Sequence, residues 1–108
     1  MTAREPAAST LGPWLDQHTA RAPDALRRRV RAYAEAAPPG SGLADTLARA
    51  GGAALERVLA APGDRSVALD LLAADALVTL ALLARAEHAP ADLGRLAGDI
   101  LRAHQARS

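Results

Sequence analysis

The sequence has no cysteine, lysine or phenylalanine, and Trp14 and Tyr33 are its only Trp or Tyr residues. Without cysteine, a disulfide framework, a thiolate metal site and a cysteine nucleophile are all excluded. Val, Ile and Thr together supply ten of the 108 residues, so residues that favour β-sheet are scarce. The formal net charge of +1 argues against holding nucleic acid or an anionic membrane by bulk electrostatics.

What the sequence does contain is mostly alanine and leucine, 29 and 17 residues respectively. The length suits one domain with its own core. We predict an all-α fold, with a flexible tail over residues 1–9, a helical bundle over 10–105 and a frayed end over 106–108. The tail lacks the apolar run of a signal peptide. The alanine-rich, lysine-free composition is typical of a GC-rich genome. Together with the lack of a signal peptide, it favours a cytoplasmic, bacterial protein.

Proline and glycine divide the chain into helical segments. Pro23 with Asp24 marks a helix start, because proline fits the first turn and an aspartate there complements the helix dipole. Pro38 and Pro62-Gly63 mark ends. The pattern predicts a bundle of four main helices plus a short N-terminal one, covering 10–19, 23–37, 43–61, about 65–88 and 91–104.

The predicted helix 43–61 is the clearest amphipathic segment. Gly51-Gly52 in its middle costs about 1 kcal/mol per glycine relative to alanine. Gly51 lies on the apolar face, so we expect either a close approach of a neighbouring helix there or a kink.

The segment at about 65–88 is apolar on every side, which is typical of a bundle centre or of a membrane span. Asp75 near its middle cancels much of the insertion energy of its leucines and valines, Asp70 adds to that cost, and Arg85 follows at once. We therefore predict a buried helix in a soluble protein, sheathed by the other helices, and no membrane association.

Asp70, Asp75 and Thr79 are the buried polar candidates of this apolar segment. Asp70 and Asp75 are five residues apart and do not share a helix face, so they form no carboxylate dyad, whereas Asp75 and Thr79 do share one. An ionised carboxylate is costly to bury without a partner. We expect Asp75 to accept hydrogen bonds from an arginine of a neighbouring helix, such as Arg49 or Arg57, or from a loop N–H. The alternative is that Asp75 acts as a buried acid or ligand. Asp70 is expected to be either buried or solvated on an alanine-rich surface.

The three histidines lack metal-ligand spacing, and no metal or cofactor is expected. We expect His18 to stack on Trp14, four residues before it, and His104 to lie near a helix C-terminus. Trp14, His18 and His104 are tentative ligand-binding candidates if they converge with Asp75 in an internal cavity.

Arg27, Arg28 and Arg31 form the only basic run. It is typical of a solvated helix face, and the alternative is a weak nucleic-acid contact. The sequence contains no glycine-rich phosphate loop and no nucleophile elbow, and we assign no catalytic residue.

These features favour a non-catalytic helical interaction module whose partner is a second copy of itself or another helical protein. An alanine-rich core buries little area per residue, and this favours a homodimer. The alternatives are a small-molecule or metal-binding bundle, possibly enzymatic, that uses Asp75 and histidines, and weak nucleic-acid contact through residues 27–31.

Overall fold

A computed structural model describes residues 11–38, 42–61, 63–88 and 93–105. Over these ranges the chain is all-α, with five helices and no strand, as predicted. The predicted tails, 1–9 and 106–108, lie outside the described residues. The helices are α1 (Leu11–His18), α2 (Asp24–Ala36), α3 (Leu43–Ala60), α4 (Val67–His88) and α5 (Leu93–Gln105).

The turn between α3 and α4 shows how local sequence sets the helix ends. Gly63 has φ of 88°, a left-handed conformation that favours glycine. Asp64 follows, and its Oδ1 accepts a hydrogen bond from the Ser66 amide at 3.0 Å. This bond holds the pKa of Asp64 below its ordinary value. The turn thus returns the chain directly into α4.

The antiparallel pair of α3 and α4 makes the most extensive helix contact in the described chain. A Cβ added at Gly51 would lie 3.0 Å from Val78 Cγ2 and 3.4 Å from Leu77 Cβ. The prediction that a neighbouring helix approaches closely at Gly51 is therefore confirmed, and α3 continues through the glycine pair as one helix.

The core lies between α3 and α4 and is completed by one residue each from α1 and α5 and by two residues from α2. About half of its members are alanines, which let helix axes approach but bury little area each. The buried cluster comprises Leu15, Val30, Ala34, Leu43, Ala44, Leu47, Ala50, Ala54, Ala73, Ala74, Leu77, Leu80, Ala81, Ala84 and Leu96.

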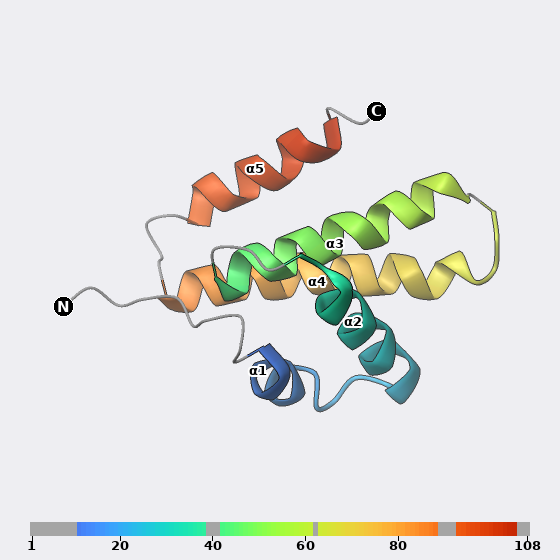
Figure 1. The fold of residues 1–108 in the computed structure, drawn as a ribbon, viewed down its shortest axis with the longest axis horizontal. Coiled ribbons are helices and arrows are strands. Elements are labelled where there is room, and N and C mark those ends of the chain that lie inside the picture. The colour runs from blue at the N-terminus through green and yellow to red at the C-terminus, as the bar shows by residue number, and fades with distance from the viewer. Residues whose placement is uncertain (1–10, 39–41, 62, 89–92, 106–108) are drawn as a thin grey trace.

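Figure 1 shows how the remaining helices are placed around this pair: α5 lies on one side of it and α1 on the other, while α2 crosses it. Helix α2 contacts both α3 and α4, and α1 contacts α2. The long apolar helix α4 is thus central to the fold, because α2, α3 and α5 all pack on it.

One expectation about α4 is wrong. The other helices do not sheathe it on every side, because Leu71, Leu72 and Leu83 are 52, 55 and 41% exposed. The face that packs against α3 is instead the alanine-rich one, including Ala73 and Ala81. Small side chains allow the close α3–α4 approach at Gly51, where Leu77 also packs. Leu71, Leu72 and Leu83 lie instead on the opposite side of α4.

Candidate functional site

Asp70 is the one acidic side chain of α4 that is buried, at 2% exposed. Its Oδ1 accepts hydrogen bonds from Arg29 Nη1 at 2.7 Å and from the Tyr33 hydroxyl at 2.8 Å. Arg57 Nε lies 3.8 Å from Oδ2. The carboxylate therefore joins α2, α3 and α4, and its buried charge is compensated by two guanidinium groups.

Arg29 and Tyr33 reach the same carboxylate because they lie four residues apart on one face of α2. Arg49 and Arg57 are the partners that the sequence predicts for a buried Asp75, but Arg57 lies near Asp70 and Arg49 donates to Asp45. Arg29 and Tyr33 were not predicted as partners of an aspartate, although their four-residue spacing was a usable signal. The cluster is a structural connection between helices, since all of its charged groups are engaged with each other.

Tyr33 gives this cluster a measurable pH dependence. Burial first, and then its hydrogen bond to the Asp70 carboxylate, raise the pKa of Tyr33 above its ordinary value of 10.0. The phenol thus ionises at lower pH in the unfolded chain than in the folded one. Its contribution to stability is complete below about pH 10 and is lost as the pH rises through the folded-state pKa.

We expect the tyrosinate absorbance of the native chain to rise at a higher pH than that of the urea-unfolded chain. Tyr33 is the only tyrosine and the chain has no lysine or cysteine, so no other side chain titrates in this range. Tyr33→Phe is expected to remove most of the alkaline loss of stability. Coincident native and unfolded titration curves would contradict the assigned contact with Asp70.

Asp75 and Thr79, the other two polar residues predicted to be buried, are exposed. The prediction is wrong because it assumed that every side of α4 is covered. Both residues lie with the exposed leucines on the side of α4 away from α3. We call this surface the outer face; it comprises Ala68, Leu71, Leu72, Asp75, Thr79, Leu82, Leu83 and Ala86, of which Leu82 and Ala86 are half-buried and the rest exposed.

The segment Val67–Glu87 of α4 is long and apolar enough to cross a membrane by length and composition alone, and less than half of it is buried in the chain. The core helix of a soluble protein passes the same test. Two features of α4 oppose a span: the ion-paired Asp70 on its inner face and Asp75 in the middle of its outer face.

The contacts of His18 and His104 do not involve Asp75. The predicted stacking of His18 on Trp14 is confirmed, with ring centroids 3.9 Å apart and planes at 18°. His18 Nε2 also lies 3.7 Å from Glu87 Oε1. His104 Nδ1 donates a hydrogen bond to the Ile100 carbonyl at 2.8 Å. Among the described residues, no three His, Asp, Glu or Cys side chains are grouped as a metal site would require.

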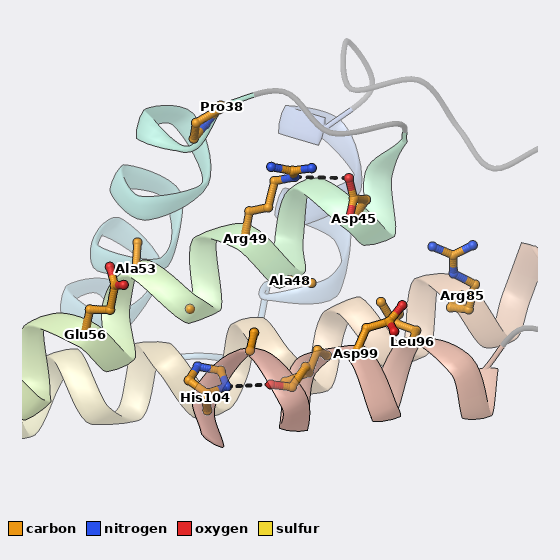
Figure 2. A pocket seen from close by; sticks show the side chains of 13 residues that line it. Pro38, Asp45, Ala48, Arg49, Ala53, Glu56, Arg85, Leu96, Asp99 and His104 are labelled. Atoms are coloured by element: carbon orange, nitrogen blue, oxygen red, sulfur yellow. Dashed lines mark hydrogen bonds and ion pairs between the residues drawn. The ribbon is translucent and has the colours of Figure 1, made fainter. Parts of the chain in front are cut away.

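A cleft of about 580 Å³ lies between α3 and α5, with Arg85 of α4 at one end (Figure 2). Its size is within the range of ligand pockets. Several charged side chains that line the cleft form ion pairs within their own helix. In α3 Arg49 donates to Asp45 at 3.1 Å, and in α5 Arg102 donates to Asp99. His104 lines this cleft, but Asp75 and His18 do not. The alternative that required Asp75 to converge with His18 or His104 in one cavity is therefore not supported by this cleft.

The basic run on α2 is largely neutralised. Arg31 pairs with Asp16 and Glu35, and Arg27 Nη1 lies 3.6 Å from Asp24 Oδ1. Arg28 is exposed. Because Arg29 turns inward to Asp70, the four arginines of residues 27–31 do not form one basic surface. This arrangement favours a solvated, ion-paired helix face over a nucleic-acid contact.

No protein-family model, curated protein or solved structure matches the chain.

One of the described surfaces is the outer face of α4. It places three large exposed leucines on one rigid helix, whereas a water-exposed helix face is usually charged. The Asp70 cluster, by contrast, is internally satisfied, and no group of side chains that could hold a metal is found among the described residues.

Proposed function

We propose that the chain is a non-catalytic, water-soluble helical interaction module that associates with a second copy of itself through the outer face of α4. The observation that carries this proposal is the exposure of Leu71, Leu72 and Leu83 on a single helix. Covering these side chains would bury apolar area that the alanine-rich core of one chain does not provide.

The polar residues of the outer face support association in water over insertion in lipid. Asp75 and Thr79 lie in the middle of the outer face, where a lipid-facing helix would have to bury them in hydrocarbon. A protein interface accommodates isolated polar groups when its partner supplies hydrogen bonds.

Sedimentation velocity across micromolar concentrations tests this proposal. We expect the wild-type chain to sediment as a dimer of the 11.1 kDa chain and Leu72→Glu to sediment as a monomer. The glutamate would place two charges in the apolar contact. Leu101→Glu is the matched control, because Leu101 is 62% exposed but lies on α5. A monomeric wild type, or equal association of wild type and Leu72→Glu, would contradict the proposal.

A further inference from the structure

The outer face of α4 has a two-fold pattern in its sequence. Measured outward from Leu77, residues of the same or complementary kind occur at equal distances in both directions. The two residues nine positions from Leu77 are both alanine, and the residues six and five positions from it are all leucine. Two positions from Leu77 there is an aspartate on one side and a threonine on the other. The pairs are Ala68 with Ala86, Leu71 with Leu83, Leu72 with Leu82, and Asp75 with Thr79.

From this pattern we infer that two copies of the chain pair antiparallel along α4, with the two-fold axis passing at the level of Leu77. The inference rests on the proposed self-association and adds its orientation, its register and its polar contacts. In a two-fold interface each residue meets a different residue of the other copy, and the relation is reciprocal. In this arrangement each residue of the outer face lies opposite the residue at the same distance on the other side of Leu77, so alanine meets alanine and leucine meets leucine.

The spacing of the face supports direct helix-to-helix packing. Ala68, Leu72, Asp75, Thr79, Leu82 and Ala86 follow one another at alternating steps of four and three residues. This is the heptad spacing that keeps one seam of a helix against a partner helix. Leu71 and Leu83 flank the seam and lie at the same level in the antiparallel pair, so they cover the layer formed by Leu72 and Leu82 from its two sides.

The polar residues decide between the two possible directions. In a parallel pair Asp75 would lie opposite Asp75 of the second copy, so two carboxylates would meet inside an apolar seam. In the antiparallel pair each Asp75 carboxylate lies opposite a Thr79 hydroxyl, which donates a hydrogen bond to it. The two aspartates are then separated by four residues, about 6 Å along the axis. Both side chains are exposed in the single chain and so are accessible to the second copy.

Polar residues in an otherwise apolar seam commonly fix its register at some cost in stability. Any shift of one helix along the other would separate Asp75 from Thr79 and leave both groups buried without a partner. The antiparallel direction also brings opposite ends of the two helix dipoles together. Asp75 and Thr79 are thus the specificity-determining residues of the proposed contact.

Disulfide formation between single-cysteine variants tests this geometry, because the natural chain contains no cysteine. Leu72→Cys and Leu82→Cys are purified separately and mildly oxidised alone or mixed. We expect a disulfide-linked dimer in the mixture and little in either variant alone. In an antiparallel pair of two Leu72→Cys chains, the introduced thiols would lie ten residues apart, about 15 Å along the axis, beyond the reach of a disulfide.

Each other outcome has a definite meaning. Efficient linkage of Leu72→Cys to itself would show a parallel pair and overturn the inference while leaving self-association intact. No linkage in the mixture, with a dimer that Leu72→Glu still dissociates, would also overturn the proposed register. A monomeric chain that instead binds phosphatidylcholine vesicles would overturn both proposals.

A second variant tests the polar contact without altering the shape of the face. Thr79→Val removes the hydroxyl donor and is expected to weaken the dimer at least tenfold in sedimentation equilibrium, because two hydrogen bonds are lost and two carboxylates stay buried without them. Thr19→Val is the control, since the Thr19 hydroxyl donates to the Leu15 carbonyl within its own chain. Unchanged association of Thr79→Val would overturn the assigned role of this residue.

Discussion

Asp70→Ala is expected to lower the free energy of unfolding by about 2 to 3 kcal/mol. The carboxylate is 2% exposed and accepts hydrogen bonds from Arg29 and Tyr33, so its removal leaves both donors without their acceptor. Loss of one partner of a fully buried ion pair costs about 3 to 5 kcal/mol. We expect less here, because the side chains of Arg29 and Arg57 are 37 and 70% exposed and can turn toward water.

Urea unfolding followed by circular dichroism measures this loss, at concentrations where the chain is monomeric. Asp75→Ala is the matched control, since Asp75 lies on the same helix but is exposed. Its effect on the monomer is expected to stay within about 0.5 kcal/mol. Asp70→Asn keeps an oxygen acceptor for Tyr33 and should fall between the two. Equal stability of Asp70→Ala and Asp75→Ala would refute the assigned role of Asp70 in joining three helices.

The second large effect is expected for Leu77→Ala, at about 3 kcal/mol of lost stability. Leu77 is completely buried and faces Gly51 across the closest approach of α3 and α4. The cavity left by its side chain has backbone on one side, so we expect little collapse around it.

The control for this cavity is Leu72→Ala, on the opposite side of the same helix. Leu72 is 55% exposed, so its truncation should cost the monomer less than about 0.5 kcal/mol. Urea unfolding of both variants at low concentration gives the comparison. A larger loss for Leu72→Ala than for Leu77→Ala would mean that the leucine-rich side of α4, and not its alanine-rich side, forms the core.

This contrast also shows which part of the fold could be predicted from sequence. Proline and glycine punctuation located the helices, because Pro23, Pro38 and Gly63 act through local backbone geometry. The close approach at Gly51 was predictable for the same reason, since a glycine on an apolar helix face favours tight packing. The all-α class followed from a composition poor in sheet-forming residues.

The orientation of α4 could not be predicted in the same way. A helix that is apolar all round carries no polar face to show which side points outward. Hydrophobicity alone assigned the leucines to the interior, whereas the helix axes approach more closely through alanine and glycine. Once that side is fixed, Asp70 is buried, while Asp75 and Thr79 are exposed, because the two aspartates lie on different sides of α4.

Within the candidate site, the need for a cationic partner of a buried aspartate was foreseeable from electrostatics, and Arg57 does take part. The choice of Asp70 as that aspartate depended on the orientation of α4. The separation of His18 and His104 from Asp75 depended on how α1 and α5 pack, and no residue spacing in the sequence specifies that. Self-association remains a prediction that the proposed sedimentation and disulfide experiments test.

The pairing of α3 with α4 has a consequence for the order of folding. The two helices are neighbours along the chain and are joined by only the residues 61–66, so bringing them together costs little loop-closure entropy. The Arg29–Asp70 pair, in contrast, connects residues 41 positions apart. We therefore expect the α3–α4 hairpin to form in the folding transition state and α2 to dock on it afterwards. Substitutions at Gly51 or Leu77 would then mainly slow folding, whereas loss of Asp70 would mainly accelerate unfolding.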